Sequence, residues 1–221
     1  LPIGLNVLLY GAPGTGKTET VLQLAKSSGR QIIKVDISKT KSMWFGESEK
    51  IIKRIFTDYH DYAATQELTP ILLFNEADAV LSSRGSVGSS NTRQTENAIQ
   101  NILLEELENF RGIFIATTNL VKNLDPAFDR RFLFKVEFSK PGLEQREQIW
   151  QTKLSFLDEN SRHELAKRFE LSGGQIDNVA RKCEINYILN ACEPDLEQLI
   201  AFCAEESITS SLSKRTIGFT I

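Results

Sequence analysis

The 221-residue sequence is poor in the residue types that build disulfide frameworks, metal clusters and membrane spans. It contains three cysteines, two histidines and one methionine. Cys183, Cys192 and Cys203 form no C-x-x-C pair and lie far from both histidines, so we expect small buried side chains on helices and no zinc site. An odd number of scattered cysteines suits a reducing compartment and favours a cytoplasmic location. No apolar run approaches the ~20 residues that a membrane-spanning helix needs.

An excess of one charge is also missing. Lys and Arg total 26 against 29 Asp and Glu, which leaves a net charge of −3. A mildly acidic chain is a poor general nucleic-acid binder, so we expect no nucleic-acid partner. The 41% apolar and 25% charged residues are typical of a globular protein and exclude a disordered chain. The first residues, 1–4, show neither an initiator Met nor a signal pattern, which we interpret as a piece of a longer chain.

Strand and helix patterns alternate over the first two thirds of the sequence. Apolar or β-branched runs predict strands at 6–10, 31–37, 71–74, 112–117 and 134–138, and helical spacing predicts helices at 18–28, 47–64 and 94–107. This order predicts an α/β fold with a mostly parallel sheet sandwiched by helices. Beyond residue 140 only helices are predicted, at 143–157, 162–169, 174–190 and 194–206. We therefore expect an α/β body at 1–139 and a small all-helical domain at 140–221.

Two of these helices have start signals. Ser172 followed by Gln175 predicts a capping box, and Pro194 suits the first turn of the last helix.

A glycine-rich segment between the first strand and the first helix predicts a phosphate site. Residues 11–18 fit the pattern G-x-x-x-x-G-K-[ST]: Gly11, Ala12, Pro13, Gly14, Thr15, Gly16, Lys17 and Thr18. In this context backbone N–H groups and the helix N-terminus face phosphates. Lys17 then reaches the β/γ oxygens, and the Thr18 hydroxyl binds Mg²⁺.

Polar residues follow the two predicted central strands. Glu76 comes after the strand at 71–74 and is our candidate for polarising an attacking water. We expect Asp78 to cap the next segment. Asn119 follows the strand at 112–117 and is a candidate for contacting the γ-phosphate or the water. Alone this is weak, because Asn is also common in turns.

Two adjacent arginines, Arg130 and Arg131, follow a short predicted helix. Arginine complements the charge of a phosphoryl-transfer transition state, although salt bridges at a helix end explain such a pair equally well.

Taken together, these motifs resemble the AAA ATPases over nearly the whole chain. In that family's terms, 11–18 looks like Walker A, 71–76 like Walker B and Asn119 like sensor 1. The resemblance implies a P-loop NTPase (Rossmann-like) body with a helical lid, ATP and Mg²⁺ as ligands, and a hexameric ring. It further implies that Arg130 and Arg131 act as fingers on a neighbouring subunit's ATP. On the adenine side it points to Ile149, Gly173 and Gly174, and the nucleotide-binding set extends to Glu19.

One further segment is similar to the central-pore loop of the protein-remodelling branch, which includes spastin and katanin. There an aromatic–apolar–Gly triplet grips an extended polypeptide, and Trp44, Phe45 and Gly46 fit that triplet. An apolar pair in a polar loop is not favoured by solvation, which supports this interpretation independently. The alternative is that Trp44 packs onto its own domain.

The resemblance implies a metal ligand at position 75, but the sequence departs from the family there: the usual Walker B aspartate is Asn75. Asn keeps a carbonyl acceptor and loses the negative charge, so we expect weaker Mg²⁺ retention and slower turnover. A lid arginine that reaches the γ-phosphate in other branches is replaced by the turn at 174–175.

We therefore expect a Mg²⁺-dependent ATPase that remodels or threads polypeptides as a ring. Two alternatives stay open: a DNA-linked ATPase of the clamp- or helicase-loader type, and a non-hydrolysing assembly switch.

Overall fold

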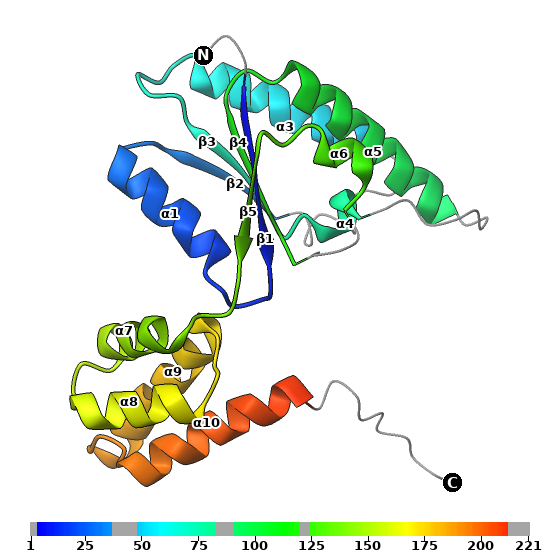
Figure 1. Cartoon of the computed structure of the whole chain (residues 1–221). Helices are drawn as coiled ribbons and strands as arrows, with labels where there is room; N and C mark the ends of the chain where they lie inside the picture. The colour runs from blue at the N-terminus through cyan, green and yellow to red at the C-terminus, as the bar shows by residue number, and fades with distance from the viewer. Residues whose placement is uncertain (1–3, 37–47, 83–90, 120–123, 212–221) are drawn as a thin grey trace, which may run out of the picture. The chain divides into compact units, whose positions relative to one another are not determined.

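The computed structural model describes residues 4–36, 48–82, 91–119 and 124–211. The chain divides into two compact units (Figure 1). The first comprises Leu1–Ala12 and Lys17–Phe138, and the second comprises Pro13–Gly16 and Ser139–Ile221. The tip of the glycine-rich loop, 13–16, thus groups with the helical C-terminal part.

The first unit is built on a five-stranded sheet in which every pair of neighbours is parallel. Its strands are β1 (Leu5–Gly11), β2 (Ile32–Asp36), β3 (Ile71–Asn75), β4 (Ile113–Thr118) and β5 (Phe134–Phe138). The order β2-β3-β4-β1-β5 places β1 between two strands that come much later in the sequence. The predicted α/β P-loop fold with a helical C-terminal part is confirmed.

Helices cover both faces of this sheet, which explains why β3 is continuously apolar. Leu72 and Phe74 pack with α3 (Ser48–Ala63) and α5 (Asn91–Asn109), whereas Ile71 and Leu73 belong to the cluster that includes α1 (Lys17–Ser28). Figure 1 shows α1 on one side of the sheet and α3 with α5 on the other. Successive strand residues point to opposite faces, so a strand buried on both faces needs an apolar residue at every position.

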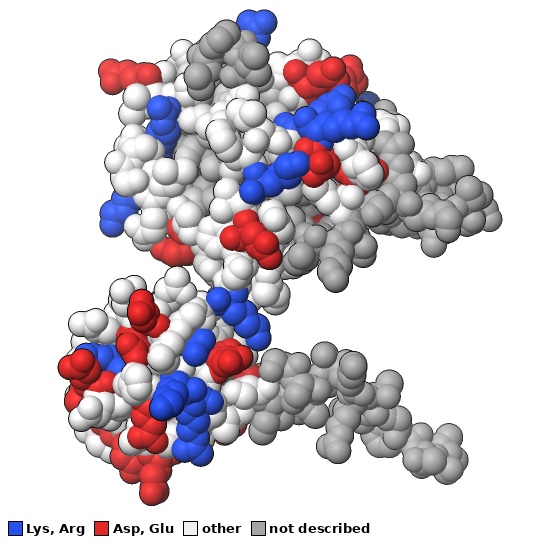
Figure 2. Space-filling model, viewed as in Figure 1, with Lys and Arg blue, Asp and Glu red and all other residues white. Residues whose placement is uncertain are grey.

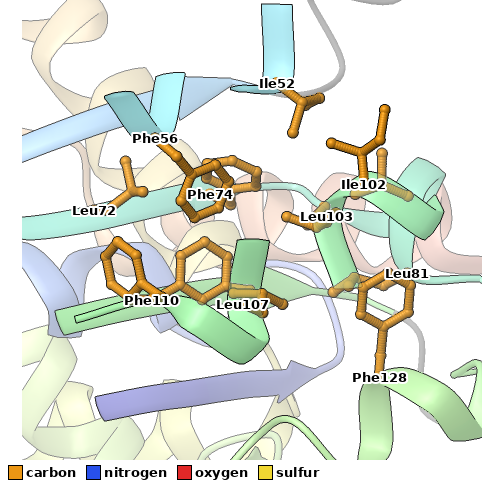
Figure 3. Packing of buried hydrophobic residues seen from close by; sticks show 14 of the residues in the cluster. Ile52, Phe56, Leu72, Phe74, Leu81, Ile102, Leu103, Leu107, Phe110 and Phe128 are labelled. Atoms are coloured by element: carbon orange, nitrogen blue, oxygen red, sulfur yellow. The ribbon is translucent and has the colours of Figure 1, made fainter. Parts of the chain in front are cut away.

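Aromatic rings fill the space between the sheet and α3 and α5 (Figure 3). The ring centroids of Phe74 and Phe114 lie 4.9 Å apart and those of Phe56 and Phe110 lie 5.5 Å apart, both in edge-to-face contact. Two short helices, α4 (Asp78–Leu81) and α6 (Pro126–Asp129), add apolar side chains to the same cluster. This packing holds the carboxyl ends of β3 and β4 in place.

Tyr59 joins α3 to the strands by hydrogen bonds as well as by packing. Its side chain is fully buried, its hydroxyl donates to the Pro70 carbonyl at 2.8 Å, and it accepts from the Ile113 N–H at 3.3 Å. Burial raises the pKa of this phenol above its usual value.

The second unit contains α7 (Leu143–Lys153), α8 (Glu159–Arg168), α9 (Gly173–Asn190) and α10 (Leu196–Ser211) around its own core. Trp150, fully buried, lies in this core. The capping box predicted at the start of α9 is confirmed: the Ser172 N–H donates to the Gln175 side chain at 2.9 Å, and the Gln175 N–H donates to the Ser172 hydroxyl at 3.3 Å.

The predicted start of α10 at Pro194 is wrong. The helix begins at Leu196, because Asp195 and Gln198 exchange two hydrogen bonds of 3.2 and 2.8 Å just before it. The start of α8 is likewise earlier than predicted, since the Asp158 carboxylate accepts from the Ser161 N–H at 2.9 Å. Carboxylate caps of this kind override the apolar periodicity on which the predictions rested.

Two of the three cysteines are buried in the second unit's core. Burial raises the pKa of Cys183 to about 11 and that of Cys203 to about 12. Cys192 is exposed after α9, so the prediction of a buried helical position is wrong for this residue. Within the described ranges, none of the helices combines the length and apolar character needed to cross a bilayer.

Candidate active site

The glycine-rich loop leaves β1 at Gly11 in a backbone conformation that favours glycine. Gly11 has φ +139°, and a Cβ built there would lie 2.2 Å from the Phe138 carbonyl oxygen of β5. Gly14 and Gly16 also have positive φ, +73° and +94°. A side chain at position 11 would therefore push β5 away and disturb the loop that leads into α1.

Lys17, at the start of α1, uses all three protons of its ammonium group. Nζ donates to the carbonyl oxygens of Gly11 at 2.9 Å and Ala12 at 2.8 Å, and to Asn119 Oδ1 at 2.9 Å. Desolvation by burial lowers the pKa of Lys17, and the nearby Asp78 carboxylate partly opposes this. The structure thus brings the predicted phosphate-binding Lys17 into direct contact with the predicted γ-phosphate contact, Asn119.

The two predicted metal ligands also meet. The Thr18 hydroxyl donates to Asn75 Oδ1 at 2.7 Å, and the Thr117 hydroxyl donates to the same oxygen at 3.2 Å. Mg²⁺ prefers oxygen ligands, and the Thr18 hydroxyl and the Asn75 amide each offer an oxygen. Neither oxygen carries a charge, so the fit is to a magnesium ion that keeps much of its water shell.

Glu76 follows β3 directly, with an exposed side chain and a left-handed backbone. Its φ of +54° is unusual for a residue with a Cβ and costs of order 1–3 kcal/mol. Its N–H donates to the Thr117 hydroxyl at 3.1 Å, and the next N–H, of Ala77, donates to the Thr117 carbonyl at 2.9 Å. These bonds to β4 hold the turn that directs Glu76 out of the sheet.

Asp78 does not cap the next segment, contrary to prediction. It is the first residue of α4, whose N-cap position is Ala77 without a side-chain bond. Its Oδ1 instead accepts from the Thr118 hydroxyl at 2.6 Å and from the Asn119 N–H at 2.9 Å. Sequence reasoning missed this role, because only the pairing of β3 with β4 brings Asp78 to the end of β4.

The two predicted finger arginines differ in their surroundings. The Arg131 guanidinium donates to Glu108 of α5 at 2.8 Å, and its backbone carbonyl accepts from the buried Asn6 side chain at 3.2 Å. Arg130 is exposed at the end of α6. Arg131 is therefore tied to its own subunit, and Arg130 is the better placed of the two to reach another molecule.

The predicted adenine-side residues lie together within the second unit. The Gly174 N–H donates to the Gly14 carbonyl at 2.8 Å. A Cβ on Gly174 would lie 3.0 Å from Gly14 Cα, and one on Gly173 would lie 3.8 Å from the Ile149 side chain. The glycines at the start of α9 thus allow a close approach of two backbones.

The remaining predicted residues add less to the site. Glu19 is exposed and accepts from the Gln23 side chain at 2.7 Å. Trp44, Phe45 and Gly46 lie outside the described residues.

On the face shown in Figure 2, acidic and basic side chains are interspersed within each unit, and neither sign forms a continuous patch.

Comparison with known proteins connects this geometry to a family. The profile of the ATPase family associated with various cellular activities (AAA) matches residues 7–140. CdcH of Halobacterium salinarum is 35% identical over 193 residues, which cover 81% of this chain and 24% of that protein. Proteasome-activating nucleotidase of Sulfurisphaera tokodaii is 33% identical over 193 residues, 83% of this chain and 47% of that protein.

A relative of lower sequence identity also matches most of this chain. Fidgetin-like protein 1 of Drosophila melanogaster is 29% identical over 206 residues, covering 88% of this chain and 38% of that protein. The chain thus spans between a quarter and a half of the length of these relatives. The crystal structure of the FIGL-1 AAA domain in complex with ADP superimposes with a TM-score of 0.70 at 20% identity, over 96% of this chain and 78% of that one. At this identity the superposition shows the fold alone. The family profile, which matches more than half of the chain, establishes that the chain belongs to the AAA family of ATPases.

Proposed function

We propose that this chain binds ATP with Mg²⁺ and hydrolyses it to ADP and phosphate. The observation that carries the proposal is the convergence of Lys17, Thr18, Asn75 and Asn119 through hydrogen bonds of 2.7–2.9 Å at the carboxyl ends of β1, β3 and β4. Crevices at this edge of parallel sheets bind nucleotides. Lys17 binds phosphate oxygens, Thr18 and Asn75 hold the metal through oxygen, and Asn119 contacts the γ-phosphate.

Glu76 is the group we assign to the attacking water. Glu76 directly follows β3, has a left-handed backbone and exposes its side chain, and its N–H is bonded to Thr117 of β4. A carboxylate there accepts a proton from water as the water attacks phosphorus. The bound metal supplies charge neutralisation for the phosphate oxygens.

We further propose that hydrolysis is completed between subunits of a homo-oligomeric, hexameric ring. The exposed Arg130 supports this, because a finger must be available to a neighbouring ATP. We assign 1–139 as the ATPase body and 140–221 as the lid, with Ile149, Gly173 and Gly174 at the adenine. We place the assembly in the cytoplasm and propose a polypeptide substrate gripped by Trp44, Phe45 and Gly46. The names of two relatives, proteasome-activating nucleotidase and Fidgetin-like protein 1, are compatible with this class of assembly.

Steady-state ATP hydrolysis against protein concentration tests the proposal. We expect a Mg²⁺-dependent rate per subunit that rises with concentration and is abolished by Glu76→Gln and Arg130→Ala. Arg54→Ala, on the exposed face of α3, is the matched control and should leave the rate unchanged. Turnover that persists in Glu76→Gln contradicts our assignment of that residue.

The neutral Asn75 specifically favours one other function, a nucleotide-dependent assembly switch without hydrolysis. In that case ATP binds and changes the oligomeric state, and no phosphate is released at any concentration.

A further inference from the structure

Asp78 is bound to the end of β4 through both of its carboxylate oxygens. Oδ1 accepts from the Thr118 hydroxyl at 2.6 Å and from the Asn119 N–H at 2.9 Å, and Oδ2 faces Asn119 Nδ2 at 3.4 Å. Asp78 and Asn119 are 41 positions apart in the sequence, so only the pairing of β3 with β4 brings them together.

The two neighbours of the Asn119 side chain determine the orientation of its amide. The Lys17 ammonium can only donate, and it contacts Oδ1 at 2.9 Å. The Asp78 carboxylate can only accept, and it faces Nδ2. Turning the amide over would oppose acceptor to acceptor and donor to donor, so this chemistry allows a single orientation.

We propose that Asp78 is a positioning residue that keeps the N–H face of Asn119 available to a γ-phosphate and thereby gives the site its preference for ATP over ADP. The proposal rests on the proposed function. All three Lys17 protons are used in this structure, so Lys17 must release a partner to reach a phosphate. Once Lys17 has left Asn119, the contact to Asp78 is the one that still fixes the amide. Nδ2 carries two protons, and the second can donate to phosphate.

The near-isosteric substitution Asp78→Asn isolates this role. Its oxygen still accepts from Thr118 and from the Asn119 N–H, which preserves the turn. Its NH₂ group, however, faces the NH₂ group of Asn119, and two opposed donors favour an inverted amide. In our proposal the inverted amide no longer offers this N–H to the γ-phosphate.

Calorimetric titration of the full chain with Mg²⁺ and either ADP or AMP-PNP measures the preference without turnover. We expect Asp78→Asn to lower the affinity for AMP-PNP about tenfold, the usual loss when a charge-assisted contact is removed. The affinity for ADP should stay within about twofold. Asp61→Asn, the same change at an exposed position of α3, is the matched control and should alter neither affinity.

A double-mutant cycle separates positioning from a merely structural role. If Asp78 acts through Asn119, Asp78→Asn has no further effect on the AMP-PNP to ADP ratio once Asn119→Ala is present. An unchanged ratio in Asp78→Asn overturns the proposal, and so does an equal drop in the Asn119→Ala background. A parallel loss of both affinities with a lower Tm also overturns it, since that result indicates a structural residue. If the wild-type chain binds neither nucleotide, the result contradicts the proposed function itself and not only the role of Asp78.

Discussion

The substitution Asn75→Asp introduces a negative charge at a buried position, and we expect it to destabilise the metal-free protein. Asn75 is 8% exposed, and its Oδ1 accepts from the Thr18 and Thr117 hydroxyls. Charging the acceptor strengthens each of these bonds by about 0.5–1.5 kcal/mol, or about 1–3 kcal/mol together. Burying a carboxylate costs several kcal/mol. The cost of desolvating the carboxylate exceeds the gain from the stronger hydrogen bonds, and we expect the free energy of unfolding to fall by about 2 kcal/mol.

Differential scanning calorimetry in EDTA tests this estimate. For a chain of this size 2 kcal/mol corresponds to a Tm lower by about 4–8 °C. Mg²⁺ with ATP should restore more stability to Asn75→Asp than to the wild type, because a negative charge would attract the metal ion more strongly than a neutral amide does. At a ligand concentration 100 times Kd, binding stabilises by about 2.7 kcal/mol.

Asn101→Asp, on an exposed position of α5, is the matched control and should shift the Tm by no more than about 1–2 °C in either buffer. If Asn75→Asp melts at or above the wild-type temperature in EDTA, the site tolerates a bare carboxylate. Our estimate that the desolvation cost of the carboxylate exceeds the gain from its two hydrogen bonds would then be refuted.

Three further outcomes follow from buried or paired groups. Tyr59→Phe leaves two backbone groups without their phenol partner and should cost about 1–3 kcal/mol in urea unfolding, whereas Tyr62→Phe on the exposed face of α3 should cost less than about 0.5. The hydrogen bond from Lys153 lowers the pKa of Asp177, so its stabilisation is present above the unfolded-state pKa and lost as the pH falls through the folded-state value. The Tm deficit of Asp177→Asn at pH 7 should therefore shrink as the pH is lowered below 3.8, the ordinary value for Asp. A thiol reagent should modify one cysteine rapidly in the native protein, and Cys192→Ser should remove that fast phase, because burial keeps the other two protonated.

The phosphate loop could be predicted because its signal is local. A strand, a glycine-rich turn and a helix follow one another within residues 5–28, and Lys17 and Thr18 occupy fixed places in that pattern. The continuously apolar β3 was equally informative, since it indicates burial on both faces. Asn75 and Asn119 were located by the same reasoning, as polar residues that end central strands.

Contacts that depend on strand register could not be predicted from the sequence. Asp78 resembles an ordinary helix cap until the pairing of β3 with β4 brings it to Thr118 and Asn119. The same holds for Arg131, whose tie to Glu108 requires α5 and the segment after α6 to pack together. The sequence pattern predicts which residue types lie at the site, and long-range packing determines which of these residues are in contact.

The position of β1 in the sheet has a consequence for how the protein is made. β1 precedes the other four strands in the sequence, yet its neighbours β4 and β5 begin at residues 113 and 134. Asn6 alone makes hydrogen bonds to residues 101 and 125 positions later. While the ribosome adds those residues, the apolar first strand has no partner and is exposed to chaperones and to aggregation. The proposed nucleotide site lies at the ends of β1, β3 and β4, so a nascent chain cannot form it before β4 has been synthesised.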